Sequence, residues 1–284
     1  MSISLTSMQP DYRPPRRRRR MWHEIGGVIL GIALLIWTLV PLYNMFLIAL
    51  SEDGDEFTGA IWPQDWNWDS FRVVWEEDYW YLENFWRQLG NSTYMALATM
   101  VLTVLIASLV SFALGRMRLR RAWIVSDIAL LTYVIPSAFL VIPFVHLMRV
   151  YGLTDSLWSV IAAEVTFATP YGILILHGYS KLIPLELDES AKVDGATPLQ
   201  LYLRIYLPLM APALVAVGVY ALLLAWNEYL YQYLLITSSR NATVAVAIDQ
   251  FFDSDEAPWN YMMALAIVYA LPPIGVFYLL RPLK

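Results

Sequence analysis

Long apolar blocks constrain this chain more than any other feature of its sequence. Several stretches of 18 or more residues are dominated by aliphatic and aromatic side chains, and the mean hydropathy is +0.51. About 20 apolar residues in a helix span the roughly 30 Å hydrocarbon core of a bilayer. We therefore predict an all-α polytopic membrane protein with six transmembrane helices, at 25–50, 93–115, 123–148, 158–179, 209–236 and 260–280.

Basic residues lie almost entirely on one side of these predicted spans. The N-terminal segment, the loops after the second and fourth spans, and the C-terminal segment together hold 15 of the 19 Lys and Arg. Short loops rich in Lys and Arg remain in the cytoplasm, so we expect both termini inside. The opposite side holds 15 of the 24 Asp and Glu, which accounts for the acidic pI of 5.2.

Composition also excludes several kinds of site. The chain has no cysteine, so disulfides, thiolate metal sites and cysteine nucleophiles are excluded. Its three histidines are scattered, and we expect neither a metal site nor a catalytic residue. The run Arg16–Arg20 suits a nucleic-acid or anionic-lipid patch or a topogenic anchor. Its position just before the first span favours the anchor, so we expect no nucleic-acid partner.

This pattern divides the chain into four parts. A basic cytoplasmic segment, 1–24, precedes the first transmembrane helix, 25–50, and a Trp-rich outer loop, 51–92, follows it. A five-helix core, 93–284, contains a polar inner loop, 180–208. Aromatic rings favour the headgroup level of a bilayer, so the outer loop is interpreted as interfacial helices or as a binding surface for an extracytoplasmic protein or ligand.

The inner loop carries signals for two short helices with a bend between them. Pro184 begins the first helix, whose acidic opening turn suits the helix dipole. Gly195 lies where a glycine in the left-handed conformation ends a helix. Thr197 begins a T-x-x-Q capping box with Pro198 at the first helical position, and this second helix is expected to run to Leu207. An amphipathic connector is the alternative, although two capped helices exceed what a connector requires.

The same loop resembles a known motif. The pattern Glu-x-Ala-x-x-x-Gly, then nine residues, then Ile-x-Leu-Pro is similar to the coupling (EAA) motif of the membrane subunits of binding-protein-dependent ABC importers. Ser190 departs from the family's usual alanine but is also small. The runs Asp188–Pro208 and Ala225–Tyr229 resemble the carbohydrate branch, closest to the smaller permease of the maltose-type pair. The residues that the resemblance implies in ATPase coupling are Asp188, Glu189, Ser190, Ala191, Asp194, Gly195, Ile205, Leu207 and Pro208.

The resemblance implies several partners. In this family two different permease subunits form the pathway within the membrane lipids, and each places its coupling helix on one of two copies of a cytoplasmic ATP-binding subunit. A periplasmic or lipid-anchored solute-binding protein delivers the solute. ATP and Mg are expected in the partner ATPase, because this sequence has no G-x-x-x-x-G-K-[ST] phosphate loop. We expect this chain to bind no cofactor and not to be an enzyme.

Charged and aromatic side chains within the spans are the remaining candidates, since charge inside a bilayer is costly. Glu164, Phe167 and Tyr171 share a face of the fourth span and combine a carboxylate with rings, as sugar sites do, although a helix–helix hydrogen bond explains Glu164 equally well. The end of the fifth span holds a second polar set, for which sugar contact and helix packing both remain open. Its members are Asn227, Glu228 and Tyr231.

We therefore predict a permease subunit of an ATP-driven importer for an oligosaccharide or glycoside, in the bacterial inner membrane. Importers of an amino acid, peptide, polyol or phosphonate remain open. A secondary transporter fits less well, because we find no inverted repeat. An intramembrane enzyme would need a convergent set of titratable residues, which the sequence does not offer.

Overall fold

The protein is described by a computed structural model that covers residues 17–52, 61–62, 66–117, 122–253 and 258–280. Within these ranges every regular element is helical, as the apolar blocks predicted. The side chains of the predicted anchor Arg16–Arg20 lie outside this description. Five helical runs have the length and composition to cross a membrane, and they are Glu24–Ala49, Trp80–Arg116, Leu157–Ser180, Pro198–Trp226 and Trp259–Leu280.

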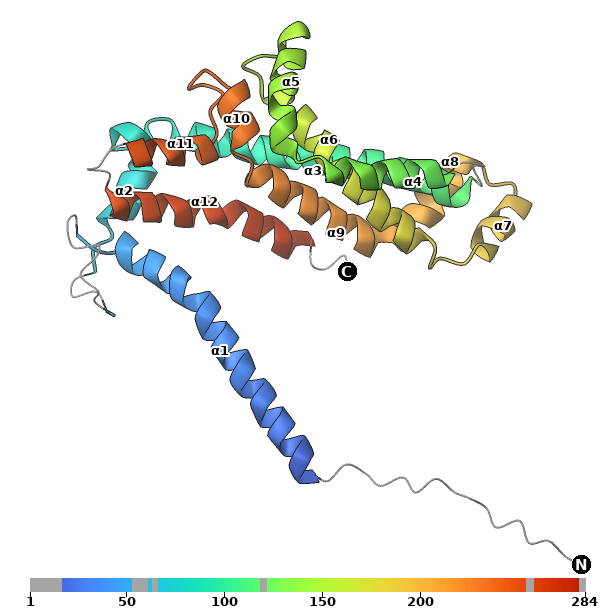
Figure 1. The fold of residues 1–284 in the computed structure, drawn as a ribbon, viewed down its shortest axis with the longest axis horizontal. Helices are drawn as coiled ribbons and strands as arrows, with labels where there is room; N and C mark the ends of the chain where they lie inside the picture. The colour runs from blue at the N-terminus through green and yellow to red at the C-terminus, as the bar shows by residue number, and fades with distance from the viewer. Residues whose placement is uncertain (1–16, 53–60, 63–65, 118–121, 254–257, 281–284) are drawn as a thin grey trace, which may run out of the picture.

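Three long helices form the centre of the molecule (Figure 1). They are α3 (Phe85–Arg116), α6 (Leu157–Ser180) and α9 (Leu207–Trp226), which pack along one another. Their close approach depends on small residues, as is usual where lipid supplies no hydrophobic drive between helices. A Cβ added at Gly172 of α6 would lie 2.9 Å from Ala107 Cβ of α3 and 3.0 Å from Val217 Cγ1 of α9.

Short helices lie at both ends of this bundle. The end where α3 and α6 finish and α9 begins, called the inner end after the predicted topology, carries α7 (Glu186–Val193), α8 (Pro198–Leu201) and the π-helical η3 (Tyr202–Tyr206) (Figure 1). At the opposite, outer end, several short elements lie near the start of α12 (Trp259–Leu280). They are α2 (Asp69–Glu76), η1 (Trp80–Leu82), α11 (Val244–Gln250) and η4 (Phe251–Asp253).

Helix α1 (Arg17–Ala49) diverges from the rest of the chain (Figure 1). It contacts α12, and its last residues, Ile48 and Ala49, are buried there. No residue of its most apolar 18-residue window is buried within the described chain. A helix whose most apolar part packs on nothing in its own chain suits a position surrounded by lipid or by another membrane subunit.

The third predicted span, 123–148, is broken rather than continuous. Helix α4 (Ala122–Leu131) runs into the 3-10 turn η2 (Thr132–Val134), and α5 (Ser137–Val150) then turns away from the bundle (Figure 1). Between them Ile135 is extended, with φ −95° and ψ 114°, because the ring of the next residue, Pro136, disfavours the α conformation. The sequence analysis predicted one transmembrane helix over 123–148, and that prediction was wrong.

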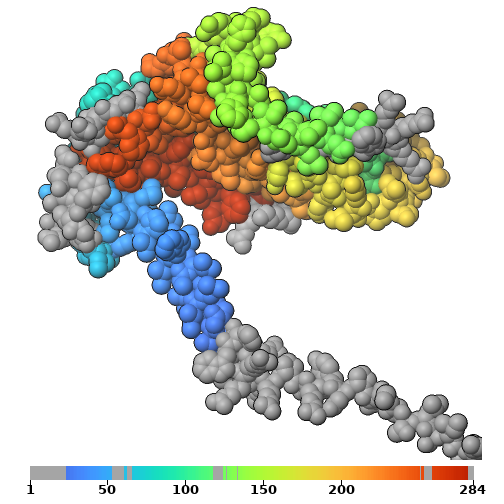
Figure 2. All heavy atoms as spheres, in the orientation of Figure 1, coloured from blue at the N-terminus to red at the C-terminus, as the bar shows by residue number. Residues whose placement is uncertain are grey.

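The fifth predicted span, 209–236, also has different limits. The helical run begins at Pro198 in the inner loop and ends at Trp226. A separate short helix, α10 (Leu230–Leu235), follows and lies beside α5, and the two protrude together in Figure 2. The second helix of the inner loop is therefore the first part of the fifth span and not a separate element.

Replacing Gly172 by alanine should destabilise the packing of α3, α6 and α9 against one another. Overpacking a close core contact costs about 1–3 kcal/mol, and the added methyl group meets side chains of both neighbouring helices. Gly178 of the same helix is a matched control, because its added Cβ would meet nothing within 4 Å. Thermal unfolding in detergent should show a lower midpoint for G172A and an equal or higher midpoint for G178A.

Candidate functional site

The inner loop closes its first helix as predicted. The backbone N–H of Gly195 donates to the carbonyl of Lys192 at 3.0 Å, and that of Ala196 donates to the carbonyl of Ala191 at 2.9 Å. These two bonds are the Schellman pattern, which requires a left-handed residue after the helix. Gly195 supplies it with φ +82°. The bend between α7 and α8 is therefore fixed by local hydrogen bonds.

The second helix of the loop begins with the predicted capping box. The N–H of Thr197 donates to Gln200 Oε1 at 2.8 Å, and the N–H of Gln200 donates to Thr197 Oγ1 at 3.3 Å. Farther on, the N–H of Leu207 donates to the carbonyl of Tyr202, which makes η3 a π turn. Pro208 has no N–H and its ring would crowd the carbonyl four residues earlier, so a wider turn accommodates it.

Two tyrosines of η3 connect the start of α9 to the end of α3. The Tyr202 hydroxyl lies 2.7 Å from Ser108 Oγ, and the Tyr206 hydroxyl donates to Ser111 Oγ at 2.9 Å. The ring of Phe112 packs edge-on against both tyrosine rings. All four polar side chains are buried, and each pair satisfies groups that would otherwise be costly to bury. The inner ends of these two helices are thus held by side-chain hydrogen bonds.

An ion pair attaches α7 to the bundle. Arg116, the last residue of α3, places Nη1 3.2 Å from Asp188 Oδ2, and both residues are 6% exposed. Its Nη2 donates to the carbonyls of Ser180 and Ile183, each at 3.1 Å. Removing one partner of a buried ion pair costs about 3–5 kcal/mol. Asp188, which the resemblance implied in ATPase coupling, therefore faces its own chain.

The sequence analysis did not single out Arg116. It appeared there only as one of many inner basic residues, because its partner Asp188 is 72 positions away. One sequence signal could have identified it. Arg116 directly follows the predicted second span, so its head group can contact the inner loop that follows the fourth span.

The other predicted coupling residues lie near one another on the inner loop. Ala191 and Ile205 are half-buried against the inner hydrophobic cluster around Leu176 and Tyr206, and Leu207 is half-buried there as well. The exposed members of the set are Glu189, Ser190, Asp194, Gly195 and Pro208.

The first loop helix also exposes apolar side chains. Val193 at the end of α7 is 87% exposed, and Leu185 and Leu187 are exposed beside the acidic first turn. Exposed apolar residues that stand together with charged ones on a short capped helix are typical of a docking surface.

Four of the predicted pathway residues meet near the outer end. Tyr231 of α10 is buried, and its ring centroid lies 5.4 Å from that of Phe167 of α6. Its N–H donates to Glu228 Oε1 at 2.7 Å, and its hydroxyl donates to the carbonyl of Ser137 at the start of α5. Glu164 is 1% exposed, and its Oε1 has no hydrogen-bond partner among the described residues. The structure thus brings both predicted carboxylates and two rings into one region.

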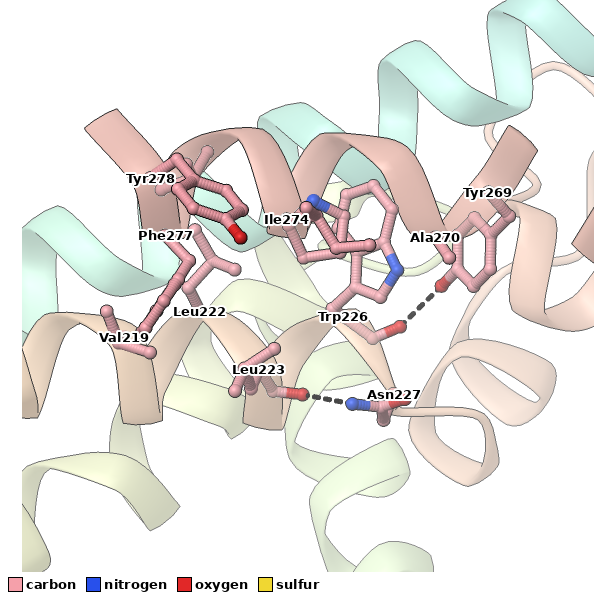
Figure 3. Close-up of a pocket in the computed structure, with 12 residues that line it drawn as sticks. Val219, Leu222, Leu223, Trp226, Asn227, Tyr269, Ala270, Ile274, Phe277 and Tyr278 are labelled. Carbon is pink, nitrogen blue, oxygen red and sulfur yellow. Dashed lines mark hydrogen bonds between the residues drawn. The ribbon is translucent and has the colours of Figure 1, made fainter. Parts of the chain in front are cut away.

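The remaining two pathway candidates lie elsewhere. The ring of Tyr171 lies 4.1 Å from that of Tyr220, across the contact of α6 and α9. Asn227 is exposed, and its Nδ2 donates to the carbonyl of Leu223 at 2.7 Å. Asn227 borders a groove of about 590 Å³ between α9 and α12, as Figure 3 shows. There Trp226 stacks on Tyr269, whose hydroxyl donates to the carbonyl of Trp226.

The outer loops are joined by Asp155. One carboxylate oxygen accepts the backbone N–H groups of Thr237 and Ser238, both at 2.9 Å, and its carbonyl accepts from Asn241 Nδ2 at 2.6 Å. The hydrogen bond from the Ser238 backbone is the main cause that lowers the pKa of the Asp155 carboxyl, and the bond from Thr237 adds to it. Asp155 has φ 57°, a left-handed conformation that Asp adopts more readily than most residues.

The described residues contain no group of three or more His, Asp or Glu side chains that could hold a metal ion. The described inner end is instead a capped, partly apolar projection tied to the bundle by Arg116 and by two tyrosines. Its arrangement suits docking to another protein.

Comparison with known families agrees with this arrangement. Residues 107–282 match the family described as the binding-protein-dependent transport system inner membrane component. The chain belongs to this family. It is accordingly a multi-pass protein of the bacterial inner membrane and a transport permease.

Several curated permeases are similar over most of their length. The trehalose transport system permease protein SugB of Mycobacterium tuberculosis is 31% identical over 93% of this chain and 93% of its own. The diacetylchitobiose uptake system permease protein DasC of Streptomyces coelicolor is 30% identical, with 92% of each chain covered. The inner membrane ABC transporter permease protein YcjP of Escherichia coli is 28% identical over 89% of this chain and 90% of its own.

Solved structures share the fold. A chain from a bacterial ABC transporter involved in import of the acidic polysaccharide alginate gives a TM-score of 0.66 at 19% identity, over 92% of this permease and 97% of that chain. A chain of the MetNI methionine ABC transporter in an inward-facing conformation gives 0.54 at 19% identity, over 70% of this permease and 95% of that chain.

Lowering the pH should loosen the outer loops of the permease through Asp155. Because its folded pKa is depressed, the carboxylate contributes stability that is present above the ordinary value of 3.8 and is lost as the pH falls through the lower, folded value. Hydrogen exchange at residues 153–157 and 237–241 should therefore accelerate below pH 3.8, after correction for intrinsic rates. In D155N the exchange should be faster at neutral pH and lose this step, and an unchanged step in D155N would contradict the assignment.

Proposed function

We propose that this permease is one of two different membrane subunits of an ATP-driven sugar importer, and that α7 docks in a groove of a cytoplasmic ATP-binding subunit. The observation that carries the proposal is the inner loop. A helix closed by a Schellman bond pair at Gly195 presents Glu189 together with exposed Leu187 and Val193. Apolar side chains at the centre of an interface and charges at its rim are the usual composition of a docking site.

The proposed mechanism rests on a docking helix in this chain and on a phosphate loop in a partner. Its sequence has no phosphate loop, so energy must come from a partner that binds ATP and Mg. Closure of two ATP-binding subunits would draw the two coupling helices together and turn the pathway outward, and hydrolysis would reset it. Glu189 would pair with a basic residue of the groove, and Gly195 would hold the bend that presents it.

A sugar is the substrate class that has most support. The relatives named above act in trehalose and diacetylchitobiose uptake, and a similar permease of Thermoanaerobacterium thermosulfurigenes belongs to a starch degradation products system. Sugars are recognised by carboxylates and aromatic faces, and Glu164, Glu228, Phe167 and Tyr231 supply both in one region. A periplasmic or lipid-anchored binding protein would deliver the sugar to the outer end.

Reversing the charge of Glu189 should weaken binding of the ATPase subunit. An arginine at this position would face the basic residue expected in the groove, and such a like-charge contact costs about 2 kcal/mol or more, which is roughly 30-fold in Kd. The measurement is the Kd of detergent-solubilised permease pair and ATPase, with E76R on the exposed outer helix α2 as the control that should bind normally. Normal binding by E189R, or transport that persists without any ATPase subunit, would refute the proposed coupling.

Transport in proteoliposomes should be selective for carbohydrate. The binding protein is supplied at the outer face of the permease. Uptake of a labelled disaccharide should then be competed by di- and oligosaccharides and not by amino acids or peptides. Competition by an amino acid alone would leave the coupling proposal in place and remove the sugar assignment.

A further inference from the structure

Arg116 contacts three consecutive segments of the chain at the inner end, namely the end of α6, the linker after it, and α7. Its guanidinium contacts the final carbonyl of α6 at Ser180, the carbonyl of Ile183 in the linker, and the carboxylate of Asp188 in α7. Arg is suited to such a position, because its planar head group presents several donors in a fixed fork. A single side chain at the end of α3 therefore holds the end of α6, the linker and α7.

The segment that it holds has limited burial of its own. Asp188 is the buried residue of α7, and Ala191 is half-buried against the inner cluster. The flanking Leu185 and Val193 are exposed. The ion pair therefore lies at the most enclosed point where α7 meets the bundle, and it supplies a charge–charge attraction that apolar packing alone does not.

The helix on which Arg116 lies is tightly engaged with its neighbours. A Cβ added at Gly115, the preceding residue, would lie 2.7 Å from Ser180 Oγ, so α3 and α6 touch directly beside the guanidinium. One and two turns earlier along α3, Ser111 and Ser108 join this helix to η3. A displacement of Arg116 is thus shared by α3, α6 and the start of α9, since packed helices move as rigid elements.

We propose that Arg116 is a positioning residue that transmits displacement of α7 to the α3–α6–α9 bundle through its ion pair with Asp188. The proposal rests on the proposed docking of α7 on an ATPase subunit, and it adds the connection by which that docking moves the pathway. Glu189 then serves contact with the partner, and Asp188, one residue earlier, serves contact with the permease's own bundle.

A merely structural ion pair makes a different prediction. If Arg116 only supported folding, its loss would reduce the amount of assembled complex, and the surviving complex would transport as many sugar molecules per ATP as before. If it transmits motion, complexes that assemble normally should hydrolyse ATP with little transport. The ratio of transport to hydrolysis therefore separates the two roles.

The test uses the complete importer in nanodiscs and proteoliposomes. D188N keeps the shape of the side chain and removes its charge, and R116K keeps the charge and loses the fork that reaches two carbonyls and a carboxylate. For both variants, transport per ATP hydrolysed should fall roughly fivefold or more, the lower end of typical coupling effects. D188E should restore much of the ratio. D69N, which breaks the exposed outer pair Arg72–Asp69, is the control and should leave the ratio unchanged.

A second measurement follows the geometry directly. The chain has no cysteine, so two introduced cysteines are its only labelling sites. They are E186C on α7 and L109C on the exposed face of α3. The distance distribution should be narrow in the wild-type background and broad in D188N. An unchanged distribution, or an unchanged transport ratio in assembled D188N, would overturn the proposal.

These outcomes remain distinct from failure of the proposed function. If the wild-type permease did not bind the ATPase at all, the proposed docking would fail while the spin-label distances still reported whether Asp188 positions α7. If E189R abolished ATPase binding and D188N kept both binding and transport ratio, docking would stand and the role assigned to Arg116 would fall.

Discussion

The close approach of α3, α6 and α9 at Gly172 is the constraint on which the rest of the structure depends. Inside a bilayer, helices gain little from burying apolar surface, so they associate where small side chains let their backbones meet. Gly172 lies against Ala107 and Val217, and Gly115 lets α3 approach Ser180 of α6 near the inner end. These contacts bring the ends of three helices together, and both polar regions of the molecule are built on those ends.

Several polar groups at the inner end are buried in pairs, whereas Nε and Nη1 of Arg116 and Nδ1 of His177 have no hydrogen-bond partner among the described residues. The hydroxyls of Tyr202 and Tyr206 meet serine hydroxyls, and Arg116 meets one carboxylate and two carbonyls. Buried polar pairs of this kind define one geometry, because any shift leaves a donor or acceptor unsatisfied. The loop is consequently a defined projection from the bundle, while α7 keeps Val193 exposed for contact with another protein.

Sequence reasoning succeeded where the controlling interactions are local. The Schellman closure at Gly195 and the capping box at Thr197 each involve residues within six positions, so their residue types already specify them. It failed at the third span, where the chain breaks before Pro136 instead of continuing as one helix, because the choice between a kink and a break depends on whether neighbours satisfy the freed backbone.

The sequence by itself determined the helical class, the approximate positions of five apolar spans and the bend of the inner loop, because apolar length and local capping bonds depend on residues close together in the chain. Only the tertiary structure decided that Asp188 faces Arg116, that Phe167 packs on Tyr231, and that Asn227 borders the groove between α9 and α12. Such pairings join residues far apart in the chain, and they depend on the rotation of each helix about its axis. Close packing fixes that rotation once the helices have assembled.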